Sequence, residues 1–337
     1  MIVVSLLASG CALFRPAAKV TSRVEYHGWK KCHVLRSHRA EVVVVPAIGR
    51  VMSFRLSNGE NVFWENEALF GSAHQEGDAA WRAGDWVNFG GDKSWPAPEG
   101  AWSALTRRNW RPPPAFDGIP MQAKVEGRDV ILTSAIDPYY GVRVKRRVHL
   151  DGVGPILRIT TTYEKVRGEP VNVSVWVITQ FKEPAGVFAP LPMRWERTNG
   201  VPLRAVSVPT RFPAGYTLLS REPPPDLKVE RNLISLTRNP KSAHKIGIDG
   251  KSLVWVGEKE WCIVSSPPVP DADYPDGGSS LEIYTNPDPL KYIELETLGP
   301  LRQMKVGDTI SQVTTYHLFR RRKPVAADEP RSFFGIR

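Results

Sequence analysis

The sequence predicts an all-β protein, folded as a large twisted antiparallel β-sandwich. Apolar and polar residues alternate along many short segments, as they do in strands that bury one face. The chain of 337 residues contains 30 prolines and 27 glycines, which is usual where many short strands need turns. No helical period of apolar residues persists for more than about two turns, and no fixed-length repeat indicates a propeller. Short strands separated by turn residues are typical of a sandwich.

The first elements are expected as a hairpin. A short apolar run at Glu41–Val45 and a second segment at Arg50–Leu56 are separated by a corner that contains a proline and a glycine. Asn58-Gly59 is a tight-turn signal, and Asn61–Glu65 follows it as the next strand.

Residues Asn66–Pro120 differ from the rest of the chain. They are rich in glycine, tryptophan and proline and show little periodicity. We therefore expect a long excursion with at most short helices near Glu67–Phe70 and Trp102–Arg107. A loop of this length without regular structure is usually functional.

Alternation returns after Met121. From Val142 to Leu150, aliphatic residues share one face and basic residues the other, and valines alternate in the same way from Val171 to Val177. No polar linker interrupts these segments, so we expect one domain over residues 20–320, followed by a basic and polar tail, 321–337, that frays. Further strands are expected near Pro155–Tyr163, Leu203–Val208, Leu227–Thr237, Ser252–Val256, Trp261–Ser265, Ser280–Thr285, Tyr292–Thr297 and Thr309–Phe319.

The N-terminus is interpreted as a targeting signal. The apolar run Ile2–Ala8 is followed by Ser9-Gly10-Cys11, and small residues before a cysteine resemble a bacterial lipoprotein signal. This predicts a signal and tether over residues 1–19, a lipid on Cys11, and a periplasmic lipoprotein of the bacterial cell envelope. The membrane is then a partner through the lipid anchor only. The alternative is a frayed N-terminal strand.

The net charge of +10 does not indicate nucleic-acid binding. The densest basic runs are Arg143–Arg147 and Arg320–Lys323, and the first alternates with apolar residues as a solvated strand face does. The sequence contains no helix-turn-helix, zinc-finger or RNA-recognition pattern. Nucleic acid is therefore excluded as an expected partner.

The cysteines and the remaining motifs predict no metal and no cofactor. There is no CxxC pair, so a structural zinc site is not expected, and the acidic loop at Asp271–Gly277 lacks EF-hand spacing. Serine-nucleophile, phosphate-loop and dinucleotide motifs are also missing. With Cys11 lipidated, Cys32 and Cys262 form a disulfide or remain as two buried thiols.

The block GGDKSWPAPEG, beginning at Gly90, is a candidate binding segment together with the preceding Asn88. Asp92 and Lys93 are suited to hydrogen-bond sugar hydroxyls, and Trp95 to stack on a sugar ring. The alternative is a well-tied structural loop in which Asp92 caps a turn.

Further candidate binding residues come from other segments. Trp176 and Gln180 share one strand face by period two, and would line a cavity if that face is turned inward to one. Arg50 and Lys245 could each reach an anion or a sugar hydroxyl. For the first two the alternative is an outward face, and for Arg50 it is an ordinary surface position.

Three segments resemble galactose mutarotase-like (aldose 1-epimerase-like) proteins. They are Pro46–Trp64, similar to the opening hairpin, Asp137–Gly152, similar to the central strands, and Tyr292–Thr309, similar to the C-terminal strand. Trp86–Trp102 is similar to a branch of that superfamily without an assigned function. The resemblance implies a galactose mutarotase-like supersandwich with the sugar on its concave sheet. In mutarotases a late glutamate is the general base and histidines act as the acid, but the strand Trp176–Gln180 has no histidine.

The late glutamates lie in the segment YIELETL. Period two places Glu294 and Glu296 on one face, about 7 Å apart, and Ile293 and Leu295 on the other. Two like charges so close raise one pKa, which suits a general base, whereas a neighbouring Lys93, Arg50 or Lys245 would lower it. We expect Glu296 to contact the sugar and Glu294 to support it.

These observations predict a carbohydrate-binding protein that is a sugar epimerase or mutarotase, or another carbohydrate-active enzyme. The alternative is a non-catalytic envelope scaffold that keeps the sandwich without a site. Convergence of Glu296, Gln180, Lys93 and Trp95 on one pocket would favour the first hypothesis.

Overall fold

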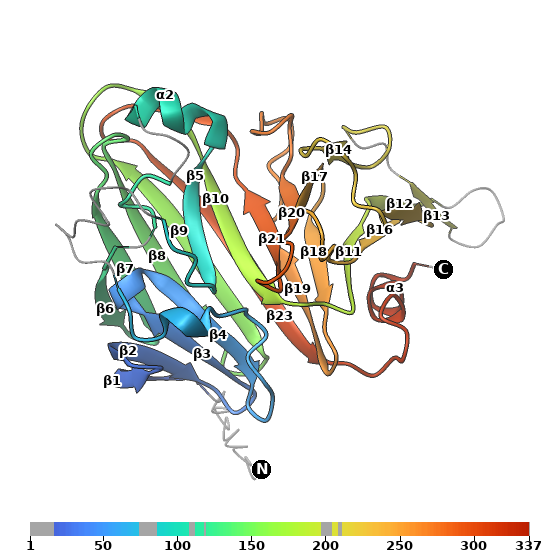
Figure 1. The fold of residues 1–337 in the computed structure, drawn as a ribbon, viewed down its shortest axis with the longest axis horizontal. Helices are drawn as coiled ribbons and strands as arrows, with labels where there is room; N and C mark the ends of the chain where they lie inside the picture. Colours follow the sequence, from blue (N-terminus) through green and yellow to red (C-terminus); the bar gives the residue numbers. More distant parts are fainter. Residues whose placement is uncertain are drawn as a thin grey trace, which may run out of the picture.

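The structure is a computed structural model that describes residues 17–73, 86–107, 112–117, 119–196, 204–207 and 211–336, with side chains left undescribed at 193–196 and 204–207. Within these residues two large sheets stack face to face, and neighbouring strands pair antiparallel (Figure 1). The predicted all-β sandwich is confirmed. Residues 1–16 of the predicted signal and tether, with Cys11, lie outside the described residues.

The first sheet carries the strands that matter for the site. Its spatial order is β1 (Lys19–Tyr26), β2 (Trp29–Arg36), β3 (Ala40–Val45), β4 (Arg50–Leu56), β5 (Asp92–Ala97), β10 (Val171–Lys182), β21 (Tyr292–Leu298), β20 (Leu281–Thr285), β17 (His244–Ile248) and β14 (Thr217–Leu218), with β22 (Arg302–Met304) also on β10.

The second sheet covers one face of the first. Its order is β15 (Lys228–Glu230), β16 (Leu233–Leu236), β11 (Gly186–Pro190), β18 (Ser252–Val256), β19 (Glu260–Ser265), β23 (Thr309–Arg320), β9 (Ile156–Lys165), β8 (Val142–Leu150), β7 (Asp129–Ile136) and β6 (Gln122–Glu126). The remaining elements are the hairpin β12 (Met193–Glu196) and β13 (Arg204–Ser207), the short helices η1 (Pro46–Ile48), η2 (Glu67–Leu69), η3 (Glu99–Ala101) and α2 (Trp102–Thr106), and α3 (Asp328–Phe334).

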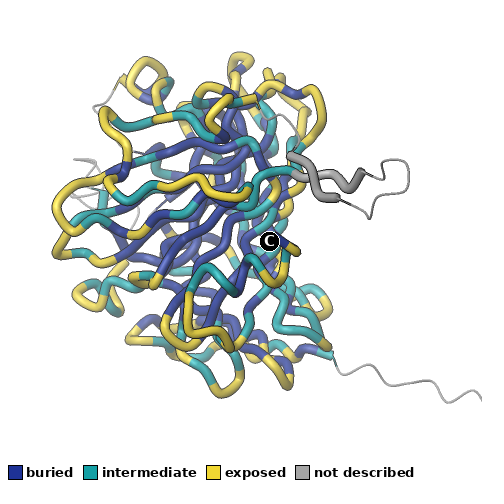
Figure 2. Tube along the Cα trace, turned by 90° about the vertical axis from the view of Figure 1, so that its right-hand side faces the viewer, coloured by how far each residue is buried: buried dark blue, intermediate teal, exposed yellow. Residues whose placement is uncertain are grey.

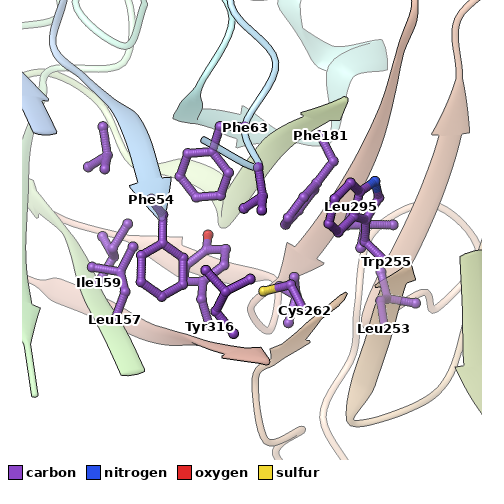
Figure 3. Close-up of a cluster of buried hydrophobic side chains, with 14 of the residues drawn as sticks. Phe54, Phe63, Leu157, Ile159, Phe181, Leu253, Trp255, Cys262, Leu295 and Tyr316 are labelled. Carbon is purple, nitrogen blue, oxygen red and sulfur yellow. The ribbon is translucent and has the colours of Figure 1, made fainter. Parts of the chain in front are cut away.

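The core fills the space between the sheets. Buried residues form a continuous layer through the middle of the molecule (Figure 2). Figure 3 shows Phe54, Phe63 and Phe181 of the first sheet and its connections packed against Trp255 and Tyr316 of the second. Alternation along each strand supplies these side chains, because every second residue of a strand points to the same face.

The cysteines settle the choice between a disulfide and buried thiols. Cys262 lies in the inter-sheet core (Figure 3), whereas Cys32 packs in a separate cluster beside Trp29 and Ile48. Both are free and fully buried, so the disulfide alternative is wrong. Burial raises the pKa of the Cys32 thiol to about 11, which suppresses its thiolate.

The segment 66–120 is more regular than the sequence predicts. Its short helices are present as η2 and α2, but residues 92–97 form β5, a central strand that pairs with β10. Both faces of β5 are buried, so its sequence shows no alternation between polar and apolar residues. That loss of alternation is why the strand was expected as a loop.

The tail beyond residue 320 also differs from the prediction. Helix α3 begins at Asp328 and packs beside Phe188 and Trp261 of the second sheet, and Ile336 is buried there. The buried carboxylate of Glu329 accepts hydrogen bonds from backbone N–H groups of Arg322 and Lys323. The expectation of a frayed tail is therefore wrong for residues 328–336. None of the helices in the described chain has the length and apolar content to cross a membrane.

Candidate functional site

Strand β21 places two carboxylates on the face of the first sheet that is turned away from the second. Ile293 and Leu295 lie in the inter-sheet core, so Glu294 and Glu296 point to the opposite face, as the alternation predicts. Their neighbours across the strands are Gln180 of β10 and Glu282 of β20. The site is thus built on the centre of a rigid sheet.

A pocket of about 520 Å³ opens on this face. This volume is within the range of roughly 300–1,000 Å³ that is typical of small-molecule sites. Its lining includes Asn88, Lys245, Glu294 and Glu296. Aromatic rings supply much of its wall, namely Trp86, Trp95, Trp176, Tyr284 and Tyr292.

Glu294 is held by one oxygen and open at the other. Its Oε1 accepts hydrogen bonds from Lys93 Nζ at 3.1 Å and from Gln180 Nε2 at 2.9 Å. No described residue donates to Oε2, and the residue is 9% exposed. Burial raises the pKa of Glu294, Lys93 opposes that shift, and the charge of Glu296 adds to it.

Glu296 lies deeper than Glu294. Its Oε2 accepts a hydrogen bond from Trp176 Nε1 at 2.7 Å and lies 2.9 Å from Lys245 Nζ. The residue has no exposed surface, and its Oε1 receives no hydrogen bond from the described chain. Lys245 also lies 2.7 Å from Glu282 Oε2 and 4.3 Å from the centre of the Trp176 ring.

Glu282 completes the cluster and was missed from the sequence. Burial raises its pKa well above the usual range against the attraction of Lys245, while repulsion from Glu296 and Asp276 raises it further. For Lys245, burial lowers the pKa, but the two carboxylates outweigh it and raise the pKa overall. The sequence did place Glu282 on a predicted strand, but only the pairing of β20 with β21 brings it beside Glu296.

Five buried oxygens in and around this cluster accept no hydrogen bond from the described residues: Asn88 Oδ1, Gln180 Oε1, Glu296 Oε1 and both carboxylate oxygens of Glu282, of which Oε2 lies in the ion pair with Lys245. The orientation of the Gln180 amide is fixed, because its nitrogen donates to Glu294. Buried polar atoms are nearly always paired, so unpaired ones at a pocket indicate a missing partner. Of these residues, Asn88 and Glu296 line the pocket, and a ligand with hydroxyl or amine donors would supply the missing partners there.

Comparisons with known proteins agree on the fold. A proposed aldose 1-epimerase from Escherichia coli K12 superimposes with a TM-score of 0.53 at 13% identity, covering 86% of this chain and 99% of that one. A galactose mutarotase related enzyme from Lactobacillus acidophilus gives 0.51 at 9%, covering 86% and 97%. A TPR-domain containing protein from Parabacteroides distasonis gives 0.54 at 11%, but the 88% of this chain that matches spans only 48% of that protein. No family model and no curated protein sequence matches the chain.

The chain has the galactose mutarotase-like fold. At these identities the comparisons show the fold alone, so the role of each residue in this mutarotase-like sandwich must come from its own geometry.

Most of the predicted site residues converge on this pocket. Asn88, Trp95, Trp176 and Lys245 line it, and so do the two glutamates. Lys93 and Gln180 lie behind Glu294 and orient it.

Asp92 does not belong to the pocket. It points between the two sheets, where Arg146 pairs with it and where Thr179 (2.7 Å) and Tyr316 donate to its Oδ2. All four side chains are buried. The predicted role of Asp92 in sugar binding is therefore wrong, and so is the view of the whole basic run 143–147 as solvated, because Arg146 lies on the inner face.

Arg50 does not reach the pocket either, but it supports the wall. It forms a buried ion pair with Asp117, and its Nη1 donates to the backbone oxygen of Gly90 at 2.7 Å. The other carboxylate oxygen of Asp117 accepts the indole N–H groups of Trp86 at 2.9 Å and Trp95 at 2.8 Å. Arg50 is thus a positioning residue for the aromatic wall of the pocket.

One histidine lines the pocket and was not predicted. Nδ1 of His244 lies 3.1 Å from the backbone oxygen of Glu222, which can only accept, so Nδ1 carries the hydrogen. Its Nε2 then accepts from Ser242 Oγ at 2.8 Å. Both ring nitrogens of His244 are thus hydrogen-bonded within the described chain and are not directed at a ligand. No group of three or more His, Cys, Asp or Glu residues in the described chain is placed to hold a metal ion.

Proposed function

We propose that the protein binds a sugar in this pocket and interconverts its anomers. The observation that carries the proposal is the state of Glu294: one oxygen is fixed by Lys93 and Gln180, the other faces the pocket, and the pKa is raised. A fixed carboxylate with a raised pKa is the form that a general base needs near neutral pH. The aromatic wall supplies the stacking surfaces that sugar rings use.

The reaction that fits these groups is ring opening and closure. Glu294 takes the proton of the anomeric hydroxyl, the bond between C1 and the ring oxygen breaks, and the ring oxygen takes a proton from the ammonium of Lys245. Rotation about the bond between C1 and C2, followed by the reverse transfers, closes the ring with the other configuration at C1. The reaction is a pure isomerisation and needs no cofactor.

The geometry favours Glu294 as the base over Glu296, the reverse of the order expected from the sequence. Glu296 has no exposed surface, and one of its oxygens is occupied by Trp176 and Lys245. Glu296 instead holds the ammonium group of Lys245 at the pocket. Glu294 has the exposed oxygen and is therefore the group that a sugar can meet.

The test is Glu294→Gln, which keeps the shape and removes the base. Exchange between the anomers of reducing sugars is measured by NMR, with Glu60→Gln, a highly exposed glutamate, as the control. We expect Glu294→Gln to lower the exchange rate by about 10²–10⁴-fold, the usual contribution of a general base, and the control to match the wild type. In the wild type the rate should fall in acid at a pH above the ordinary glutamate pKa of about 4.3. An unchanged exchange rate in Glu294→Gln would show that Glu294 is not the general base.

A non-catalytic sugar-binding module is the second candidate. It is favoured by the lack of a histidine with an open nitrogen among the described residues that line the pocket: the strand Trp176–Gln180, where the resemblance expects one, has none, and both ring nitrogens of His244 are hydrogen-bonded. In that case sugars bind with no acceleration of anomer exchange, and Glu294→Gln weakens binding instead of turnover.

A further inference from the structure

Among the described residues at the pocket, acidic side chains outnumber basic ones. Glu99, Glu294 and Glu296 line it, Glu282 pairs across the strands with Glu296, and Lys93 and Lys245 are the described lysines that meet Glu294, Glu296 and Glu282. The charge of each lysine is already balanced: that of Lys93 by Glu294, and that of Lys245 by Glu282 and Glu296, which use two of its three N–H donors and leave one for a neutral ring oxygen. Among the described residues that line this pocket, no cation is therefore left for a phosphate or a carboxylate on the ligand.

The polar side-chain atoms at the pocket without a described partner are all hydrogen-bond acceptors. Oε2 of Glu294, Oε1 of Glu296 and Oδ1 of Asn88 are all acceptors. The indole N–H of Trp176 is donated to Glu296, and that of Trp95 to Asp117. The group that this lining matches best is one that only donates, and a protonated amine is such a group.

The aromatic rings add a second attraction for a cation. Lys93 already lies 4.6 Å from the centre of the Trp95 ring, so ammonium groups are accepted beside these indoles. Tyr284 is the cross-strand neighbour of Glu294, and Tyr292 is on the same face of β21, with 6.4 Å between the two phenol rings. A cation at Oε2 of Glu294 would thus be close to two further aromatic faces.

We propose that the pocket is specific for amino sugars, that is, sugars carrying a free protonated amine, with Glu294 and the two tyrosines around the amine. This inference rests on the proposed function, since it assumes that a sugar occupies the pocket. A charged donor to a carboxylate binds more strongly than a hydroxyl in the same place.

The experiment compares chemically matched sugars by calorimetric titration at a pH below the pKa of the amine. The set is glucose, glucosamine, N-acetylglucosamine, glucuronic acid and glucose 6-phosphate, with the galactose counterparts of each. We expect the free amines to bind about tenfold tighter than the neutral sugars, the difference between a charged and a neutral hydrogen bond. N-acetylation should remove that gain, and the two anionic sugars should bind most weakly.

Each other outcome is informative. Equal affinity for amine and neutral sugars, or tightest binding of an anionic sugar, overturns the amino-sugar inference and leaves sugar binding intact. No binding of any member contradicts the proposed function, and this inference falls with it.

Two variants locate the amine. Glu294→Gln should reduce the affinity ratio of amine to neutral sugar to about one. Tyr284→Leu, which keeps the carboxylate and removes one ring, should lower the ratio by a smaller factor, and it serves alone if the first variant does not fold. A ratio unchanged in a folded variant of either kind overturns the placement.

Discussion

Two groups of buried charges lie on opposite faces of the same central strands. Between the sheets, the Asp92–Arg146 pair is surrounded by Thr179 and Tyr316, and both oxygens of Asp92 are bonded. On the other face, Glu294 and Glu296 each have one oxygen bonded and one without a described donor. The chemistry of the two groups is similar, but only the second has capacity left for a ligand.

The difference shows how to separate structural from functional polar clusters. A buried charge must be paired and hydrogen-bonded to be tolerated. The inner cluster meets that condition with the chain alone, so its role is to join the sheets. The pocket cluster meets it incompletely, with neighbouring acids and raised pKa values, and such incomplete clusters are common at functional sites.

The largest expected effect is on the inner cluster. Asp92→Ala leaves Arg146 buried without its partner, and breaking a buried pair in this way destabilises a protein by about 3–5 kcal/mol. Urea unfolding followed by circular dichroism measures the loss. The control is Arg147→Ala, at the residue that follows Arg146 in β8. The Arg147 side chain is 45% exposed, and its surface ion pairs contribute less than about 1 kcal/mol. Similar losses in both variants would mean that the inner cluster is not a structural unit.

A sharper comparison uses two consecutive residues of β10. Thr179 donates to Asp92 in the interior, whereas Gln180 faces the site with an unpaired oxygen. Thr179→Val should lower the free energy of unfolding by about 1–3 kcal/mol, because it leaves a buried acceptor with one donor fewer. Gln180→Leu should change it by less than about 1 kcal/mol, because it also removes an unsatisfied atom, yet it should weaken sugar binding. The comparison fails if the order of the two stability losses is reversed.

The smallest effect is expected at Glu282. Its folded pKa is raised, so its contribution to stability is present below the ordinary glutamate pKa and is lost as the pH rises through the raised value. Glu282→Gln removes the ionisation and should raise the melting temperature on the order of 2 °C in mildly alkaline buffer. The gain should shrink toward mildly acidic pH. A gain that grows on acidification would show that Glu282 is charged and stabilising in the native state.

The sequence predicts which face of each strand carries the site, but it predicts only some of the residues that form the site. Alternation in YIELETL correctly placed both glutamates away from the core. It could not separate Lys93, which faces the pocket side, from Asp92, which faces the interior, because β5 is buried on both faces. Asp117 was not predicted at all, since it lies in an irregular segment and is recognisable only by its contacts to Arg50 and the tryptophans.

By itself the sequence determined the class of fold and the inward or outward sense of the alternating strands. These follow from local geometry, because side chains on a strand repeat every second residue whatever its neighbours are. Only the tertiary structure decided which strands lie side by side. Lys93 and Glu294 are 201 residues apart in the chain, and they meet because β5, β10 and β21 are adjacent in one sheet. That order results from packing the whole sandwich, and it alone decides whether a buried charge finds its partners within the chain or leaves an oxygen open in a pocket.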